Sequence, residues 1–511
     1  MLARVHSAAI LGVNAYPVQV EVDVSFGKEA ISVVGLPDAA VRESIDRVEA
    51  AIRNSGFEFP KQRVTVNLAP ADIRKEGPAF DLPIALGLIV ATGQVAADGI
   101  LDEVALTGEL SLDGRLRPIS GALPMALGSR DAGRRALVVP PDNGNEAAVV
   151  ADFEVFAAET LYDCVKLLEG DLRDEPVHVS DRDISLETPP YEADMSDVKG
   201  QDHVKRALEI AAAGGHNCVM VGPPGSGKTM LARRVPSILP PMTLEEALEV
   251  TKLYSVKGLM RPGDALIQTR PFRHPHHTVS SAGLIGGGSF PSPGEVSLAH
   301  HGVLFLDELP EFPRNALEVM RQPLEDGEVT IARAQTTLTF PARFQLVGAM
   351  NPCPCGFATD PQRECTCGQA QIQRYLKQIS GPLLDRIDIH IEVPRLTPEE
   401  VMQKQPGESS ASIRDRVVAA RTRQHERFAE APFHNNSEMT SRALRDFCGI
   451  STEVETVLKA AIEQFALSAR AHDRIIKLAR TIADLEGADQ IGVAHAAEAV
   501  QYRSMDRKLW G

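Results

Sequence analysis

The stretch that decides the fold is Gly222-Pro-Pro-Gly-Ser-Gly-Lys228-Thr229. An apolar run, Cys218–Val221, precedes it, and a helical run, Met230–Val235, follows it. This order of strand, glycine-rich loop and helix is the context that the phosphate-binding motif G-x-x-x-x-G-K-[ST] requires. Glycines let backbone N–H groups point inward to cradle phosphates, and the start of the helix adds its positive end. The sequence therefore predicts a parallel-sheet α/β domain that binds ATP and Mg²⁺.

Within this loop the last two residues have distinct predicted roles. Lys228 should reach the β and γ phosphates, and Thr229 should hold Mg²⁺. A chance glycine-rich turn is the alternative, but it does not explain the flanking strand and helix. The predicted nucleotide-binding residues of the loop are Gly222, Pro223, Pro224, Gly225, Ser226, Gly227, Lys228 and Thr229.

Two further apolar strands end in polar residues. Val303–Leu306 runs into Asp307 and Glu308, and Phe344–Met350 runs into Asn351. A strand this apolar is buried, so its acids emerge at the sheet edge beside the loop. Asp307 would then organise Mg²⁺, and Glu308 would orient and polarise the attacking water. Asn351 is placed to hold that water or the γ phosphate; a strand-terminal acidic turn is the alternative for the two acids.

The alternation of strands and helices divides the chain. Short β-branched strands such as Val18–Val24 alternate with helical runs such as Ala39–Arg53, which predicts an N-terminal α/β domain. A stretch rich in Asp, Glu, Pro and Ser reads as a linker, and strands stop after Pro394. The predicted parts are an N-terminal domain (1–170), a linker (171–197), the ATPase core (198–394) and a helical lid (395–511).

Composition limits the function and the location. The 511-residue chain has a net charge of −16, so its overall charge gives no argument for nucleic-acid binding. Local basic surfaces are compatible with this net charge. The first fifteen residues lack a secretory pattern. The longest apolar stretch, about 82–93, is interrupted by Pro83 and Gly87 and is too short to span a bilayer. We expect a cytoplasmic protein with no membrane contact.

Four of the seven cysteines crowd into fifteen residues. They form two C-x-C pairs: Cys353, Cys355, Cys365 and Cys367. In a cytosolic chain this clustering suggests metal before disulfide, and four thiolates can wrap a tetrahedral Zn²⁺. C-x-C is tighter than the usual C-x₂-C spacing, so unliganded thiols or a redox switch remain alternatives to structural zinc.

The ATPase core resembles the magnesium-chelatase and replicative-helicase branch of AAA+ proteins. Asn351 occupies the sensor 1 position of that branch. Ser380–Asp388 resembles the segment that supplies an arginine finger, Arg386, to the ATP of a neighbouring subunit. Ser468-Ala-Arg470 resembles the start of the helix that carries the sensor 2 arginine. A surface salt bridge is the alternative role for Arg386 and Arg470.

Two segments resemble the channel loops of that branch. Arg273–Thr278 and the glycine-rich run after it resemble the helix-2 insert, and Leu324–Phe340 resembles the pre-sensor 1 hairpin with Arg333 near its tip. An arginine there could grip a phosphate backbone without reading its sequence, or it could be merely solvated. The predicted DNA-binding residues are Arg333, His276 and His277. A metal site is the alternative for the histidines, but adjacent side chains diverge.

The N-terminal domain resembles the protease domain of Lon around Gly77-Pro-Ala-Phe-Asp81 and Thr107–Gly121. That family uses a Ser-Lys dyad. Ala79 stands where the serine would follow Gly-Pro, and no lysine occurs from Leu116 to Ser129. The resemblance implies a shared fold without proteolysis.

Taken together, the whole chain resembles the YifB/ComM family of magnesium-chelatase-like AAA+ proteins, down to Asp506-Arg-Lys-Leu-Trp510. The resemblance implies a homohexameric helicase that acts on single-stranded and branched DNA without sequence preference, promotes branch migration in natural transformation, and has recombination proteins as partners. The alternatives are a magnesium-chelatase-like motor or a remodelling ATPase acting on a protein. Ala79 argues against a protease. The presence of Glu308, Asn351 and Arg386 together argues against a scaffold that only binds nucleotide.

Overall fold

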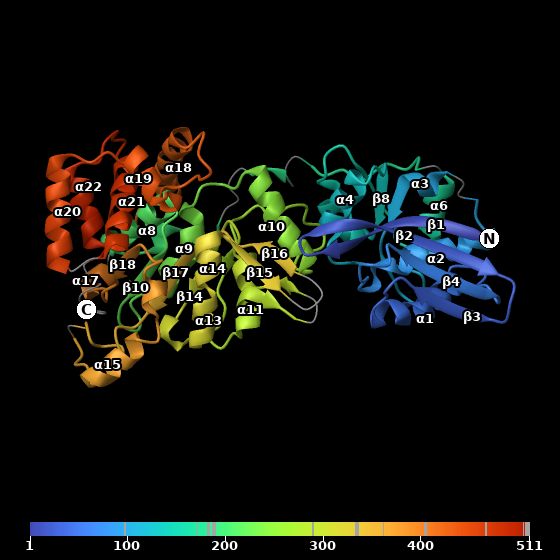
Figure 1. Ribbon diagram of the computed structural model, residues 1–511, viewed down its shortest axis with the longest axis horizontal. Helices are drawn as coiled ribbons and strands as arrows, with labels where there is room; N and C mark the ends of the chain where they lie inside the picture. Colours follow the sequence, from blue (N-terminus) through green and yellow to red (C-terminus); the bar gives the residue numbers. More distant parts are fainter. Residues whose placement is uncertain are drawn as a thin grey trace. The chain divides into compact units, whose positions relative to one another are not determined.

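A computed structural model describes the chain except for residues 97–98, 171, 181–183, 187–190, 289–290, 333–336, 361, 403–405, 466–467, 504 and 506–511. The chain forms two compact units (Figure 1). The first unit comprises Met1–Leu186 and Thr243–Gln268, and the second comprises Glu187–Met242 and Thr269–Gly511.

The first unit is built on a seven-stranded sheet with the order β3-β4-β2-β1-β5-β8-β9. Antiparallel pairing joins β1 to β2 and β2 to β4, and the other neighbours are parallel. The strands are β1 (Leu2–Leu11), β2 (Asn14–Ser25), β3 (Ala30–Val34), β4 (Arg63–Ala69), β5 (Val104–Leu106), β8 (Ala136–Val139) and β9 (Glu154–Ala157). The α/β pattern is confirmed, but β1 was not predicted from the sequence.

Helices cover this sheet, and one of them comes from far along the chain. α10 (Leu244–Val256) packs on α4 (Ala122–Asp131), and Gly121 N donates to Ser255 O at 2.9 Å. The predicted core of 198–394 is therefore interrupted, since 243–268 belong to the first unit. The other elements of this unit are α1 (Ala39–Asn54), α2 (Asp81–Ala91), α3 (Ile100–Glu103), β6 (Glu109–Leu110), β7 (Leu116–Arg117), α5 (Gly144–Ala148) and α6 (Leu161–Glu169).

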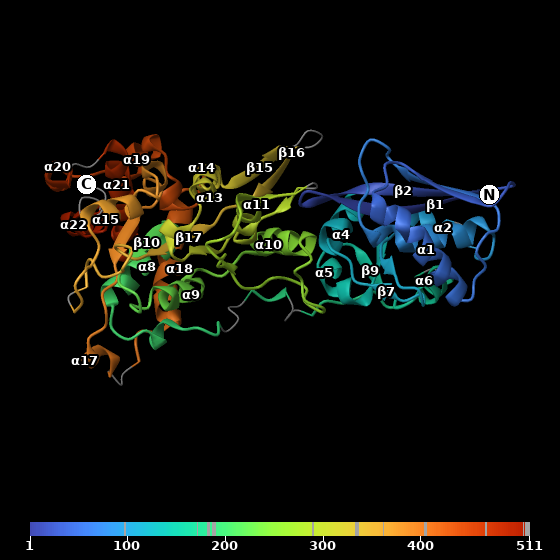
Figure 2. The ribbon, with the colours of Figure 1, turned by 90° about the horizontal axis from the view of Figure 1, so that it is seen from below.

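The second unit contains the predicted parallel sheet, in the order β11-β14-β17-β10-β18. All four pairings are parallel. Figure 2 shows α8, α9 and α18 gathered around β10 and β17. The strands are β10 (Cys218–Val221), β11 (Phe272–Arg273), β14 (Val303–Leu306), β17 (Gln345–Met350) and β18 (Ile389–Glu392). The helices of this core are α8 (Asp202–Gly214), α9 (Lys228–Ile238), α11 (Ser281–Ile285), α12 (Glu295–Leu298), α13 (Arg314–Val319), α14 (Arg321–Asp326), α15 (Gln369–Leu376) and α16 (Gly381–Leu384).

Two hairpins leave this core. β15 (Glu328–Ala332) and β16 (Thr337–Pro341) pair antiparallel, which confirms the predicted hairpin. Arg333, near its tip, lies outside the described residues. β12 (Gly286–Gly287) and β13 (Ser292–Pro293) form the second hairpin, in the segment predicted to be the helix-2 insert.

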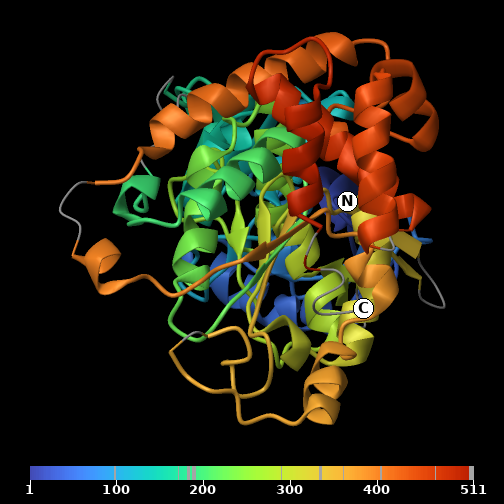
Figure 3. The same ribbon diagram turned by 90° about the vertical axis from the view of Figure 1, so that its left-hand side faces the viewer.

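After β18 the described chain is helical, as predicted, and Figure 3 shows its red helices packed together. The first lid helix is capped by Thr397, because Glu400 N donates to Thr397 Oγ1 at 3.2 Å. The lid helices are α17 (Pro398–Val401), α18 (Ser410–Arg427), α19 (Ser441–Phe447), α20 (Thr452–Phe465), α21 (Ala469–Leu485) and α22 (Val493–Gln501). No helix in the described part of the chain combines the length and the apolar character needed to cross a membrane.

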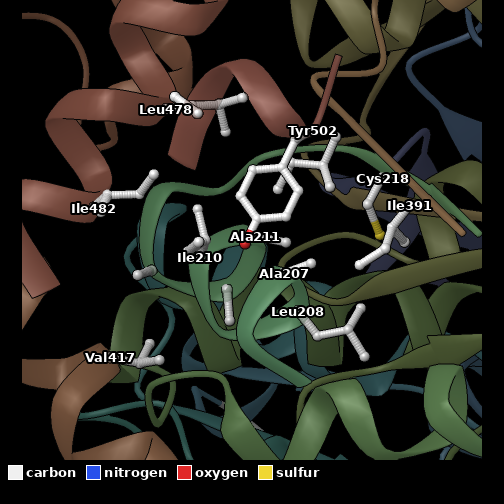
Figure 4. Packing of buried hydrophobic residues seen from close by; sticks show 14 of the residues in the cluster. Ala207, Leu208, Ile210, Ala211, Cys218, Ile391, Val417, Leu478, Ile482 and Tyr502 are labelled. Carbon is white, nitrogen blue, oxygen red and sulfur yellow. The ribbon is translucent and has the colours of Figure 1, made fainter. Parts of the chain in front are cut away.

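One hydrophobic core joins the lid to the sheet of the second unit. Leu208 on α8, Cys218 on β10 and Ile482 on α21 are all fully buried in the same cluster (Figure 4). Val417 on α18 extends it on the lid side, and Ile391 on β18 extends it on the sheet side. Apolar burial of this extent is the main force that holds such elements together.

Candidate functional site

The glycine-rich loop starts where β10 ends, at the carboxyl edge of the parallel sheet. Gly222 cannot carry a side chain here, because a Cβ atom would lie 2.1 Å from Val393 O. Gly225 and Gly227 have φ angles of 77° and 89°, a region that glycine enters without steric cost. The loop then runs directly into α9, whose first residue is Lys228. The predicted strand, loop and helix are confirmed.

Lys228 is buried inside this loop. Its Nζ atom donates to Gly222 O at 2.8 Å and to Pro223 O at 2.9 Å, and it lies 3.4 Å from Asn351 Oδ1. Burial lowers the pKa of Lys228 to about 8, and the nearby Asp307 carboxylate opposes that shift. The ammonium group thus lies among carbonyl oxygens at the point where phosphate oxygens would replace them.

Thr229 and Asp307 meet beside the loop. Thr229 Oγ1 donates to Asp307 Oδ2 at 2.7 Å, and the other Asp307 oxygen accepts from Glu308 N at 2.9 Å. A hydroxyl and a carboxylate side by side are oxygen ligands of the kind that Mg²⁺ takes when it also binds phosphates. These two residues therefore fit the predicted Mg²⁺ site, and the ion would neutralise charge on the phosphates.

Glu308 occupies a left-handed turn with φ 52°, and its side chain is 55% exposed. The exposed carboxylate is free to approach a water molecule, as the predicted role of water activation requires. Its described partner is His277, whose Nδ1 atom lies 3.1 Å from Glu308 Oε2. The sequence predicted His277 as a DNA contact. Nothing in the local pattern indicated that it contacts Glu308, which lies about thirty residues further along the chain.

The neighbouring His276 has a different environment. Its Nδ1 atom lies 2.9 Å from Thr278 Oγ1, within its own loop. The two imidazole ring centres are 4.2 Å apart, but the described contacts of the two side chains differ.

Gln201 is a site residue that the sequence analysis missed. Its side-chain amide donates to Ser226 O at 2.9 Å and to Pro394 O at 3.1 Å, so it ties the nucleotide loop to the chain leaving β18. Gln201 itself is buried at a left-handed turn with φ 54°. The Gly200-Gln201 pair before α8 is the only sequence signal for this turn.

Arg386 lies at the other edge of the sheet. It comes three residues before β18, and Asn217 Nδ2, just before β10, donates to its carbonyl oxygen at 3.0 Å. Since β10 and β18 are parallel, a strand of four residues, about 13 Å long, separates this edge from the nucleotide loop. The guanidinium of Arg386 pairs with Glu325 on α14.

Arg470, at the start of α21, shares that edge. Its side chain is 74% exposed, and its Nη1 atom lies 3.6 Å from Asp385 Oδ2, in the residue before Arg386. The structure thus brings Lys228, Thr229, Asp307, Glu308 and Asn351 together, and it places both predicted arginines elsewhere in the same chain.

The four clustered cysteines lie between β17 and α15, and their sulfur atoms are all within 4.8 Å of one another. The N–H group of Phe357 holds the pKa of the Cys355 thiol below its usual range. The sequence prediction that the four residues form one group is confirmed; an ion bound to them stays a prediction.

In the first unit, the Lon-like position 79 carries no nucleophile. Ala79 is buried with Ala8 and Met125, and Thr107 Oγ1 donates to Ala79 O at 3.3 Å. Asp81, two residues further along the chain, is fully buried and accepts from Arg47 Nε at 2.9 Å. These polar groups are occupied in holding the fold together.

Comparison with known proteins covers nearly the whole chain. Three family models match: "Magnesium chelatase, subunit ChlI" at residues 194–401, "Subunit ChlI of Mg-chelatase" at 20–143, and "Magnesium chelatase, subunit ChlI C-terminal" at 407–503. The chain is 44% identical over 512 residues to the protein YifB of Salmonella typhimurium and 45% identical over 515 residues to the competence protein ComM of Haemophilus influenzae. Each match covers 99% of this chain and 98% of the relative.

A partial match concerns Lon. Over 132 residues the chain is 31% identical to the Lon protease of Chloroflexus aurantiacus. This match covers 24% of this chain and 16% of that protease. The predicted Lon likeness is confirmed at this level.

Proposed function

Because the chain belongs to the YifB/ComM family of magnesium-chelatase-like AAA+ ATPases, we propose that it is a ring-forming motor that couples ATP hydrolysis to movement on DNA. Its substrates are single-stranded and branched DNA, bound without sequence preference. Its role is branch migration during natural transformation and homologous recombination, in the cytoplasm and together with recombination proteins. The ring is a homohexamer.

The observation that carries the proposal is the division of the site between two sheet edges. One chain presents Lys228, Asp307 and Glu308 at the carboxyl edge, while Arg386 leaves from the opposite edge, about a strand length away. An arginine side chain, about 7 Å long, cannot span that gap. Arg386 therefore reaches phosphates only if they belong to a neighbouring subunit, and a closed ring gives every subunit such a neighbour.

Support for DNA as the substrate comes from the hairpin and from a relative. The β15–β16 hairpin forms in the segment that resembles the pre-sensor 1 hairpin, and one relative is named competence protein ComM. The family models favour a second candidate, since they describe a magnesium-chelatase subunit. In that case the same motor would remodel a protein partner.

DNA-stimulated ATP hydrolysis separates these candidates. We expect the rate to rise with single-stranded DNA and to rise further with a four-way junction, and we expect junction branches to migrate only while ATP is hydrolysed. The control protein is Lys228→Ala, which should bind DNA without moving it. An ATPase that no form of DNA stimulates would exclude the DNA motor and leave the remodelling candidate.

Mixed rings test the shared site separately. Subunits with Lys228→Ala have a damaged loop and an intact Arg386, and subunits with Arg386→Ala have the reverse. Mixing them should restore part of the hydrolysis that each lacks alone, because some interfaces combine the two intact halves. Mixed oligomers that stay inactive would contradict a site completed by a neighbour.

A further inference from the structure

The four cysteine sulfur atoms all lie within 4.8 Å of one another, close enough to share one metal ion. Cys353 Sγ lies 3.3 Å from Cys355 Sγ and 3.7 Å from Cys365 Sγ, and the Cys355 and Cys365 sulfurs are 3.6 Å apart. Four sulfurs bound to one zinc at about 2.3 Å stand about 3.8 Å from one another. Two of these three distances lie close to that value and the third is shorter, so the ligands need to move little to bind one ion.

Backbone N–H groups are directed at the same sulfurs. Cys355 N lies 3.4 Å from Cys367 Sγ, and Cys367 N lies 3.4 Å from Cys365 Sγ. Groups that contact the ligand atoms in this way orient the ligands of a metal site. Thiolate ligands in a tetrahedral set select zinc over magnesium or calcium. A cluster of unliganded thiols needs neither the common centre nor the converging donors.

We propose that Cys353, Cys355, Cys365 and Cys367 bind one structural Zn²⁺ ion, and that the resulting knuckle, described at residues 353–360 and 362–367, braces the nucleotide loop. The zinc half of this proposal stands on the cluster alone. The bracing half rests on the proposed ATPase function.

One side of the knuckle lies against the loop. Gly356 has a φ angle of 87°, and a Cβ atom there would lie 2.5 Å from Pro224 Cδ and 2.7 Å from Pro224 Cγ. Cys353 also follows Asn351 by only two residues, and Asn351 contacts Lys228. A metal that fixes Cys353 and Cys355 therefore fixes the segment between Asn351 and the surface of Pro224.

The other side of the knuckle is held by the segment after β18. The buried Asp360 carboxylate lies 2.7 Å from Arg395 Nε, and the Arg395 guanidinium stands 5.8 Å from the centre of the Phe357 ring. Arg395 follows Pro394, whose carbonyl accepts from Gln201. The knuckle thus lies between two segments that both reach the nucleotide loop, and loss of the metal would loosen both.

Metal content tests the zinc half on the full-length protein purified under reducing conditions. We expect one zinc per chain by elemental analysis, and stoichiometric release of zinc when a mercurial reagent titrates the thiols. Cys365→Ser and Cys367→Ser should each weaken zinc binding by at least about a hundredfold. Cys164→Ala, which removes a buried cysteine in the first unit, should keep the zinc.

Replacing zinc with Co²⁺ in the wild-type chain gives a readout that needs no variant. Intense thiolate-to-cobalt charge-transfer bands are expected for a tetrathiolate site. Wild-type protein with four titratable thiols and no zinc, with disulfides, or with iron and sulfide in place of zinc would overturn the assignment, whether or not the protein hydrolyses ATP.

Gly356→Ala tests the bracing half, with Gly368→Ala as the matched control. A Cβ at Gly368 meets nothing within 4 Å. We expect Gly356→Ala to keep its zinc and to raise the KM for ATP at least about fivefold, because alanine strains a left-handed position and also meets Pro224. Gly368→Ala should leave both unchanged. A normal KM in zinc-loaded Gly356→Ala would overturn bracing while leaving the zinc site intact.

Discussion

The two units use acidic side chains beside glycine-containing turns in opposite ways. In the first unit, Asp81 is fully buried and accepts from Arg47 Nε and Nη2 at 2.9 and 3.1 Å and from Leu110 N at 3.2 Å. In the second unit, Glu308 is 55% exposed and its described partner is one histidine. A buried carboxylate whose oxygens accept hydrogen bonds stabilises the fold, whereas a solvent-exposed carboxylate can act on a substrate. Residue type alone does not separate the two cases.

Burial shifts the pKa of one group in each unit. It raises the pKa of Asp81 to about 6, against the pull of Arg47, and it lowers the pKa of Lys228 to about 8. Near neutral pH both groups are charged. Asp81 is compensated within its own unit, while the described partners of the Lys228 ammonium are carbonyl oxygens, the Ser226 hydroxyl and the nearby Asp307. Anionic phosphate would therefore complete the second site.

The largest expected effect is on catalysis in the second unit. Glu308→Gln should lower kcat by about 10²–10⁴-fold, because a general base contributes that much, while ATP still binds. Steady-state hydrolysis and nucleotide affinity measure the two parts. In the first unit, Ala79→Ser should create no peptidase activity and leave kcat unchanged. Normal hydrolysis in Glu308→Gln would reassign the base.

The next effect concerns the stability of the first unit. Arg47→Ala leaves the buried Asp81 uncompensated and should cost about 3 kcal/mol, near the lower end for a broken buried pair because Arg47 is partly exposed. The matched control on α1 is Arg53→Ala, which removes the exposed pair with Glu49 and should cost less than about 1 kcal/mol. Denaturant unfolding measures both, and equal losses would show that burial does not distinguish the two pairs.

Much of the second site could be predicted because it follows from local pattern. Apolar strands that end in polar residues, in a parallel sheet, place Lys228, Asp307 and Asn351 at one edge. The contact of His277 with Glu308 and the assignment of Thr243–Gln268 to the first unit could not be predicted. Both depend on tertiary packing between segments separated by thirty to more than a hundred residues, which no periodicity records. Gln201 was missed for the same reason, since its partners lie in two distant loops.

A smaller effect concerns the pH dependence of ATP binding by the second unit. Bound phosphates should raise the pKa of Lys228 again, so ATP binding above pH 8 takes up a proton, and affinity should fall by up to about tenfold per pH unit there. Calorimetry in two buffers with different ionisation enthalpies measures this uptake. Lys228→Arg, which stays charged, should bind without it. Absence of proton uptake on binding above pH 8 would show that the loop lysine is already fully protonated in the free protein.

The smallest expected effect tests whether His277 positions the exposed carboxylate of Glu308 in the second unit. His277→Ala removes the 3.1 Å contact to Glu308, and the loss of such a polar contact, worth about 1 kcal/mol, should lower kcat about fivefold with KM for ATP unchanged. His276→Ala is the matched control, since His276 contacts Thr278 and not the acid. The effect of His277→Ala should vanish in a Glu308→Gln background, because a glutamine there no longer acts as a base. If His276→Ala lowers basal kcat as much as His277→Ala does, the segment acts on the site as a loop, and the contact with Glu308 carries no separate role.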